Sequence, residues 1–245
     1  MRNWTLVLAL LIGLQVSAQE AEWTSIKDIN PFIGTGGHGH THPSAQAPFG
    51  MIQLGPNTRY EGWDGCGGYH YTDSAMYGFS CTHLSGTGVS DYGDLLMLPY
   101  SSPTKEGDHI KFFKEDEHAQ AGYYACILDD GTRIEATAGD RTGILRIRFG
   151  EGGEPGIMID LNFRDRVLKK SFEATGIGEW QGSRISEGWA REQHFYFGLE
   201  ITARPDTAIE VSDGVYWIPL PEGTRETSVR MGMSGTSEQG AWRNF

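Results

Sequence analysis

The chain has 245 residues, of which 38% are hydrophobic and 21% charged, so it can build a globular core and is not disordered by composition. Its formal net charge of -12 excludes a nucleic-acid-binding role and opposes adhesion to anionic lipid, because both need basic patches. The same charge is compatible with a neutral ligand such as a sugar.

The first 18 residues have the pattern of a secretory signal peptide. Arg2 supplies a positive start, Leu6 to Leu14 is apolar, and Val16-Ser17-Ala18 is a small-residue cleavage site. The apolar stretch is too short to span a bilayer. We therefore expect an exported protein, periplasmic or extracellular, with no membrane span after signal cleavage, whose mature chain begins with a polar lead-in over 19–28.

Turn-forming residues dominate the segment from 30 to 93. Strand character is confined there to 50–54 and 77–80, and a clear strand at 94–99 is stopped by Pro99. The 34 glycines of the chain, against ten prolines, are typical of an all-β domain with irregular loops.

The second half of the sequence is more regular. Asp129-Asp130-Gly131 predicts the turn of a hairpin between 122–128 and 132–138. Further strands are predicted by alternation or apolar runs at 142–149, 156–161 and 194–201. Their spacing predicts an all-β fold, a two-sheet antiparallel β-sandwich over residues 29–220.

The three cysteines, Cys66, Cys81 and Cys126, leave at least one thiol without an intrachain partner. Cys66 and Cys81 are close enough in sequence to close a disulfide within the glycine-rich region. Three buried thiols are the alternative, and the sequence does not decide between the two.

The densest group of unusual residues lies between Asn30 and Gly88, where glycine alternates with histidine, tryptophan and aspartate. Trp63 and Asp64 suit a sugar, since an indole stacks on the C–H face of a pyranose and a carboxylate accepts hydrogen bonds from its hydroxyls. The alternative is a core tryptophan in a turn. The flanking Gly62 and Gly65 favour exposure.

His38, His40 and His42 alternate along the chain, so an extended backbone would place three imidazoles on one face, as a zinc site requires. The glycines between them disfavour a regular strand. Structural roles or hydrogen bonds to a substrate are therefore the favoured interpretation, and a zinc-dependent hydrolase is the alternative.

A serine-hydrolase triad of Ser85, His83 and Asp91 lacks the G-x-S-x-G elbow and its strand-to-helix frame. Paired carboxylates for glycoside hydrolysis would have to come from loop aspartates, which commonly form turns. The candidates are Asp64, Asp73, Asp91 and Asp94, and no pair stands out.

Taken together, the ordered motifs resemble the amino-terminal domain of glycoside hydrolase family 92, the calcium-dependent exo-acting α-mannosidases. The matching segments are NPFIGTG at 30–36, PFGM at 48–51, GWDGC at 62–66, GYHY at 68–71 and THLSGTG at 82–88. The resemblance extends from about residue 29 to about residue 209. His42, Ser44 and Cys81 depart from the residues that the family usually has at these positions.

The resemblance implies a β-sandwich packed on a larger helical barrel, which supplies the general acid, the base and most calcium ligands of an inverting reaction. Catalytic and metal-binding residues are therefore expected outside this chain. The substrate-binding candidates are Trp63 first, then Asp64, Gly65, Cys66, His83 and Ser85. Residues 221–245 are expected to begin the connection to that barrel, in cis or as a second chain.

The predicted function is that of the amino-terminal domain of an exported α-mannosidase that removes terminal α-linked mannose from glycans, N-glycans among them. The chain alone is expected to be inactive. The alternative is a non-catalytic carbohydrate-binding module, which predicts measurable mannose affinity for the isolated chain.

Overall fold

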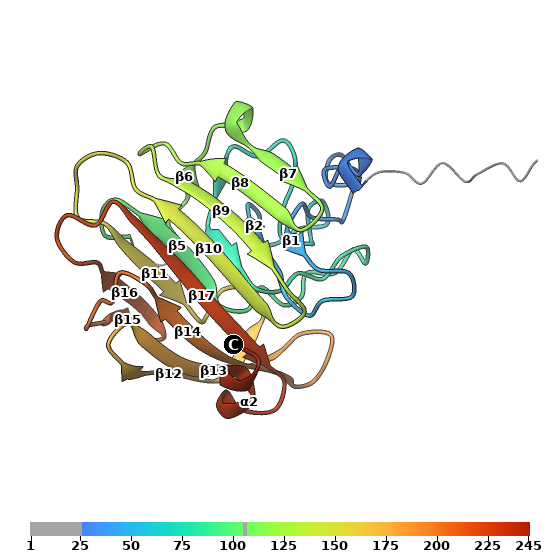
Figure 1. The fold of residues 1–245 in the computed structure, drawn as a ribbon. Coiled ribbons are helices and arrows are strands. Elements are labelled where there is room, and N and C mark those ends of the chain that lie inside the picture. Colours follow the sequence, from blue (N-terminus) through green and yellow to red (C-terminus); the bar gives the residue numbers. More distant parts are fainter. Residues whose placement is uncertain (1–25, 105–106) are drawn as a thin grey trace, which may run out of the picture.

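The computed structural model of the protein describes residues 26–104 and 107–245, and these form two antiparallel sheets packed face to face. The prediction of an all-β, two-sheet antiparallel β-sandwich is confirmed (Figure 1). The expected signal peptide over 1–18, and the lead-in as far as residue 25, lie outside the described residues. Within the described ranges, none of the helices has the length and apolarity that crossing a membrane requires.

One sheet has seven strands in the order β1-β2-β4-β5-β11-β16-β15. Its strands are β1 (Ala45–Gln46), β2 (Gln53–Asn57), β4 (Gly78–Ser80), β5 (Leu96–Tyr100), β11 (Gly156–Asp160), β16 (Val215–Pro219) and β15 (Ile209–Ser212). The central β11 is buried at every position, because it lies beneath the second sheet and each of its residues pairs with both neighbouring strands.

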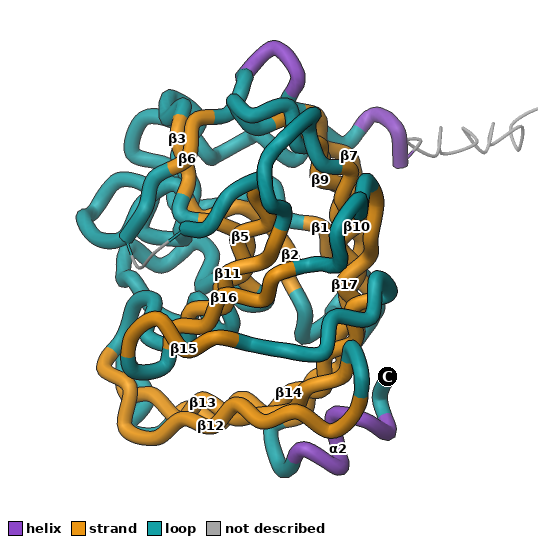
Figure 2. Tube along the Cα trace, turned by 90° about the vertical axis from the view of Figure 1, so that its left-hand side faces the viewer, coloured by secondary structure: helices purple, strands orange, loops and turns teal. Residues whose placement is uncertain are grey.

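The other sheet has eight strands in the order β12-β13-β14-β17-β10-β9-β8-β7. These are β12 (Arg166–Gly176), β13 (Glu179–Glu187), β14 (Gln193–Ile201), β17 (Glu226–Ser234), β10 (Thr142–Arg148), β9 (Arg133–Ala138), β8 (Tyr123–Ile127) and β7 (His118–Gln120). In Figure 2 this sheet runs along the right side and the bottom, so it bends around the seven-stranded sheet.

Short elements complete the fold. They are the two-stranded pair β3 (Ala75–Met76) and β6 (Ile110–Lys111), the 3-10 turns η1 (Ile26–Asp28) and η2 (Lys114–Asp116), and the helix α2 (Glu238–Arg243). The helix packs on the outer face of the eight-stranded sheet, where Gly198 and Gly232 leave room for Trp242 and for the backbone of Ala241.

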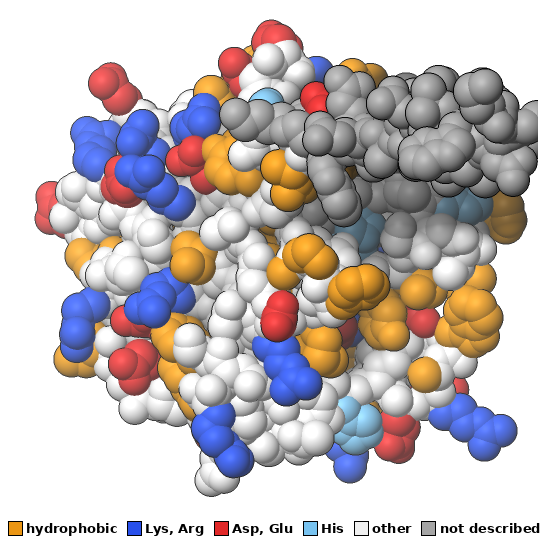
Figure 3. All heavy atoms as spheres, turned by 45° about the vertical axis from the view of Figure 1, so that its right-hand side comes forward, with side chains coloured by type: hydrophobic (Ala, Val, Ile, Leu, Met, Phe, Trp, Pro, Cys, Tyr) orange, Lys and Arg blue, Asp and Glu red, His pale blue; other side chains and the backbone are white. Residues whose placement is uncertain are grey.

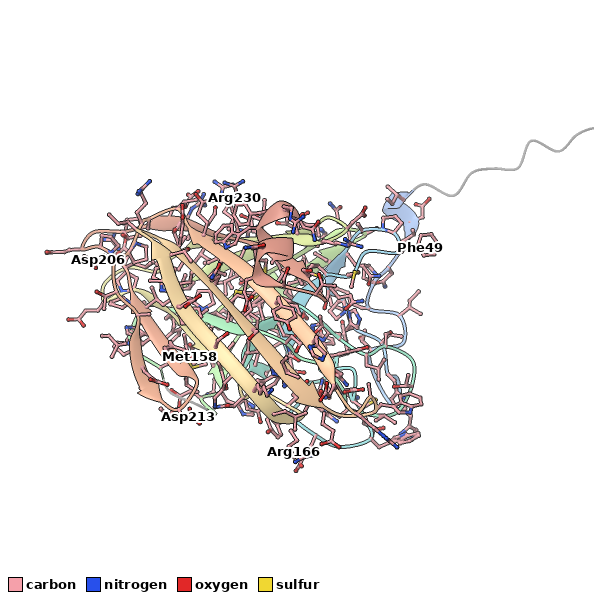
Figure 4. The ribbon with its side chains drawn as sticks, turned by 90° about the horizontal axis from the view of Figure 1, so that it is seen from below. Phe49, Met158, Arg166, Asp206, Asp213 and Arg230 are labelled. Atoms are coloured by element: carbon pink, nitrogen blue, oxygen red, sulfur yellow. The ribbon has the colours of Figure 1, made fainter. Side chains whose placement is uncertain are left out.

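The hydrophobic core fills the space between the two sheets. β10 shows the alternation read from the sequence, with Leu145 and Ile147 fully buried and Arg146 and Arg148 exposed. Met158 lies in the interior, whereas Phe49 and Asp206 stand at opposite ends of the sandwich (Figure 4). The core is apolar, apart from the polar groups described below.

The structure extends the sandwich beyond the expected boundary at residue 220. β17, in the segment expected to begin a connection, pairs with β10 on one side and β14 on the other. Val229, Met231 and Met233 of β17 are buried in the core. Residues 226–234 are therefore a central strand of the domain.

Candidate functional site

The loops between residue 30 and residue 93 gather at one end of the sandwich. Figure 3, which brings this side forward, shows apolar side chains grouped near histidines, with most charged side chains further out. Exposed apolar residues of this segment include Ile33, Phe49, Met51, Trp63, Tyr71 and Val89. The candidate site is therefore built from loops that rest on the edge of both sheets.

Trp63 is the most accessible aromatic side chain of the predicted site, at 63% exposure. The edge of the His40 ring meets its indole at 4.7 Å between centroids. Gly88, in the left-handed region at φ +79°, allows the indole to lie against the backbone, since a Cβ there would stand 2.7 Å from Trp63 Cη2. The prediction of an exposed rather than a core tryptophan is confirmed, and the indole has a defined orientation.

Asp64 lies beside Trp63, and its carboxylate accepts a hydrogen bond from His38 Nδ1 at 2.7 Å. This contact raises the pKa of the His38 imidazole and lowers the pKa of the Asp64 carboxyl. Gly65 follows at φ +70°, where a side chain would collide with Arg59. Trp63, Asp64 and Gly65 therefore lie in one turn, in which Trp63 is exposed, Asp64 is partly exposed and Gly65 is buried.

His83 is buried beneath this turn and is held neutral, because burial lowers its pKa to about 4. Its Nδ1–H donates to the Gly67 carbonyl at 2.8 Å, and its Nε2 lies 3.3 Å from Ser80 Oγ. The His42 ring stacks on it at 4.6 Å, and burial lowers the pKa of His42 as well. His83 therefore supports the loops from below, and does not face solvent as a direct ligand contact would.

Ser85 is exposed, whereas His83 and Asp91 are buried, and no described hydrogen bond joins the three. Asp91 instead accepts hydrogen bonds from Gln193 Nε2 at 2.6 Å and from the Trp189 amide at 3.1 Å. The serine-hydrolase arrangement is therefore not formed among the described residues.

The three alternating histidines diverge to three different partners. His38 contacts Asp64, His40 contacts Trp63, and His42 stacks on His83. Within residues 26–104 and 107–245, no group of three or more histidine, cysteine or acidic side chains has the geometry to hold a metal ion. The glycines between the histidines turn the backbone, so the strand-like alignment that zinc needs is not adopted.

The cysteines are three buried free thiols, which decides between the two alternatives left by the sequence. The Cys81 thiol donates to Met231 Sδ at 3.2 Å, in the core between the sheets. Burial raises the pKa of the Cys66 and Cys81 thiols, so neither is a reactive thiolate. Cys66 contributes to the site through its backbone, which ends the Trp63 turn.

A buried arginine–carboxylate network, which the sequence did not single out, lies behind the site. Arg184 of β13 is 0% exposed and its Nη1 lies 2.5 Å from Asp94 Oδ1. Its remaining donors reach the carbonyls of Leu161, Phe163 and Arg164 at 2.9–3.0 Å. All three nitrogens of the Arg184 guanidinium are thus paired, as a buried charge requires.

A second acid, Asp165, shares this region with Asp91. The Tyr92 amide donates to Asp165 Oδ2 at 2.8 Å and to Asp91 Oδ1 at 3.1 Å. Burial, followed by the hydrogen bond and charge of Asp91, raises the pKa of the Asp165 carboxyl to about 7. The Asp165 carboxyl therefore holds a proton below neutral pH, and its hydrogen bond to Asp91 joins the two loops.

Backbone strain is concentrated in the same two loops. Tyr92, Leu95, Arg164 and Asp165 have positive φ values between 43° and 70°. Such conformations cost about 1–3 kcal/mol each and persist only where the surroundings enforce them. The arginine network supplies that enforcement.

A cavity of about 400 Å³ adjoins these loops at the start of β14. Thr82, Tyr92, Asp94 and Gln193 are among the residues that border it. The predicted site residues do not belong to its described lining. The exposed indole of Trp63 is therefore not part of this cavity.

Comparison with known proteins agrees with the fold. Residues 29–245 match the family model described as the glycosyl hydrolase family 92 N-terminal domain. The chain is similar to the solved family GH92 α-mannosidase BT3965 from Bacteroides thetaiotaomicron, with a TM-score of 0.80 and 29% identity over 90% of this chain and 35% of that one. The same enzyme in complex with mannoimidazole gives the same TM-score and identity.

Two further relatives are more distant. The structure of the GH92 family glycosyl hydrolase ccman5 shares the fold, with a TM-score of 0.80 and 23% identity over 89% of this chain and 34% of that one. A protein of Arthroderma benhamiae named as an uncharacterized secreted glycosidase is 28% identical over 170 residues, 62% of this chain and 22% of that protein. The chain therefore spans about a third of the solved relatives and about a fifth of the fungal protein.

Proposed function

Since this chain belongs to glycoside hydrolase family 92, we propose that it supplies one wall of the mannose-binding pocket of an exported α-mannosidase. The enzyme removes terminal α-linked mannose from glycans such as N-glycans, with inversion. The solved relative at 29% identity is named an α-mannosidase, and one of its structures is a complex with mannoimidazole, which supports the choice of sugar.

The observation that carries this proposal is the Trp63 turn. The indole is exposed, held edge-on by His40 and seated against Gly88, so its orientation is fixed before a ligand arrives. A flat apolar face beside a carboxylate matches the alternation of C–H and hydroxyl groups on a pyranose. A preorganised surface of this kind loses little conformational entropy on binding.

The reaction chemistry is assigned to the helical domain, in cis or as a second chain. An inverting mechanism needs a general acid and a base about 6.5–9.5 Å apart, so that a water molecule fits between the base and the sugar. We propose that the helical domain supplies a glutamate as acid and an aspartate as base. The role of this chain is to bind and orient mannose against them.

Calcium, which the family resemblance implies, is also assigned to the helical domain. Calcium takes six to eight oxygen ligands. The described acidic residues of this chain do not fit such a site, since they form no group of three that could hold a metal ion, and Asp91 and Asp94 are already engaged by Gln193 and Arg184. No step is therefore attributed to calcium within this chain.

Replacing Trp63 with alanine in the complete enzyme is expected to lower kcat/KM for an α-mannoside by about 10- to 100-fold, since burial of a large apolar side chain contributes roughly 1.5–3 kcal/mol. Trp63→Phe should retain part of the activity. The matched control is Trp189→Ala, because Trp189 is equally exposed, at 69%, but lies on the β13–β14 loop.

Equal kcat/KM values for the Trp63→Ala and Trp189→Ala enzymes would contradict the proposed role of the Trp63 turn. The isolated chain provides the second arm of the test. We expect it neither to turn over an α-mannobioside nor to bind mannose measurably by calorimetry. Measurable mannose affinity of the isolated chain would favour the alternative, a non-catalytic carbohydrate-binding module.

A further inference from the structure

A buried arginine holds both ends of the segment that carries Trp63, and His83 supports the same loop at Gly67. Arg164 is 1% exposed, and its guanidinium donates from Nε to the Tyr60 carbonyl at 3.2 Å and from Nη2 to the Cys66 carbonyl at 2.7 Å. These two carbonyls stand at the two ends of the segment that carries Trp63. We infer that Arg164 is a positioning residue that sets the orientation of Trp63 toward the sugar.

The guanidinium fits this segment closely because Gly68 has no side chain. Gly68 adopts φ +104°, and a Cβ there would stand 3.1 Å from Arg164 Nη1 and 2.5 Å from Asn57 Oδ1. The absence of a side chain at Gly68 therefore leaves room for Arg164 Nη1. Gly93 likewise leaves room for the aliphatic part of the Arg164 side chain, since a Cβ there would lie 2.9 Å from Arg164 Cδ.

Arg164 is itself held in place by Arg184. The Arg184 Nη2 donates to the carbonyls of Phe163 and Arg164, at 2.9 Å each, and its Nη1 pairs with Asp94. These bonds keep the backbone of Arg164 at φ +56°, which aims its side chain across the site instead of along the strand. Two arginines in series thus connect β13 to the Trp63 turn.

The hydrogen bonds to Asp64 and Gly65 lie nearer to solvent. Arg59 Nη1 donates to the Asp64 carbonyl at 3.1 Å, the Gly65 amide donates to Gly39 at 3.4 Å, and His38 contacts the Asp64 side chain. The Arg59 side chain is 30% exposed and that of His38 is 87% exposed. Because buried hydrogen bonds to a charged donor are stronger than exposed ones, Arg164 dominates.

Lysine cannot replace Arg164 in this role. The planar guanidinium presents several donors in a fixed fork, which suits two carbonyls at once, whereas an ammonium is a compact point charge on a flexible stem. The inference deepens the proposed function and rests on it, since the orientation of Trp63 matters to the enzyme only if Trp63 contacts mannose.

The test follows the Trp63 indole N–H signal by NMR in the full chain, with the signal assigned from a Trp63→Phe sample. In Arg164→Lys we expect this signal to shift or broaden while the signals of Trp180 and Trp217 stay unchanged. Hydrogen exchange of the amides between residues 60 and 68 should become about tenfold faster, the loss expected for one such hydrogen bond. Amide protection in β17 serves as the internal measure of folding.

Arg164→Gln gives an independent variant, because its neutral amide can reach only one of the two carbonyls. The matched control is Arg225→Lys, whose arginine donates to the Gly150 carbonyl in an exposed loop. An unchanged indole signal and unchanged loop exchange, in variants with normal β17 protection, would overturn the inference. Sugar plays no part in this experiment, so its failure is distinguishable from failure of the Trp63→Ala activity test.

Discussion

Replacing Arg184 with methionine is expected to lower the free energy of unfolding by about 3–5 kcal/mol, the usual cost of leaving one member of a buried ion pair uncompensated. The substitution would strand the Asp94 carboxylate, whose side chain is 4% exposed, within the core. It would also free the carbonyls of Leu161, Phe163 and Arg164, which accept from the same guanidinium. Methionine fills part of the volume but offers no donor.

Urea unfolding followed by circular dichroism measures this loss. The control is Arg230→Met in the same sheet, where Arg230 Nη1 lies 2.7 Å from Glu200 Oε2 but both side chains are partly exposed. Exposed pairs contribute about 0–1 kcal/mol, so this variant should remain close to the wild type. Similar losses for the two variants would show that burial of the Arg184 network does not stabilise the fold.

The second large effect is expected from Asp165→Asn, which should become more stable than the wild type as the pH rises from 4.5 to 8. The pKa of Asp165 is raised to about 7 in the folded protein, against about 3.9 in an unfolded chain. Between these values the folded state holds a proton that the unfolded state lacks, so wild-type stability falls with rising pH. An asparagine amide can donate to Asp91 at any pH.

The expected difference between the two proteins changes by about 2–3 kcal/mol over this range, since one pKa unit corresponds to about 1.4 kcal/mol and partial exposure weakens the effect. The pKa values of His42 and His83 are lowered, so the stability that these residues contribute rises with pH, opposite to the effect of Asp165. They are common to both proteins and cancel in the comparison. The control is Asp206→Asn, at an exposed position. A difference in stability between the wild type and Asp165→Asn that does not change with pH would disprove the proton held by Asp165.

The strands that the sequence predicts well are those with one face in the core. β10 alternates because Leu145 and Ile147 point inward, and the Asp130-Gly131 turn between β8 and β9 was visible from its residue types. β12, at the sheet edge, is mostly exposed and polar, so it carries no such alternation. β13 shows no alternation of hydrophobic and polar residues in the sequence, because its inward positions include Gly182 and the charged Arg184.

The exposed part of the site was readable from local sequence, whereas its support was not. Gly62 and Gly65 mark the Trp63 turn as a solvent-facing bend, and the structure agrees. Arg164 acts through two backbone carbonyls that lie 98 and 104 residues away in sequence. Every residue has a backbone carbonyl, so no sequence motif predicts such a contact.

The position of β17 has a consequence for how the domain is made. The last strand of the sandwich is inserted between β10 and β14, which are separated from it by tens of residues. During synthesis from the amino terminus, β10 and β14 each have one unpaired edge until residues 226–234 are made. Unpaired strand edges can pair with strands of other chains. Completion of the domain therefore waits for its final strand, and we expect the nascent protein to depend on protection from aggregation until that strand closes the sheet.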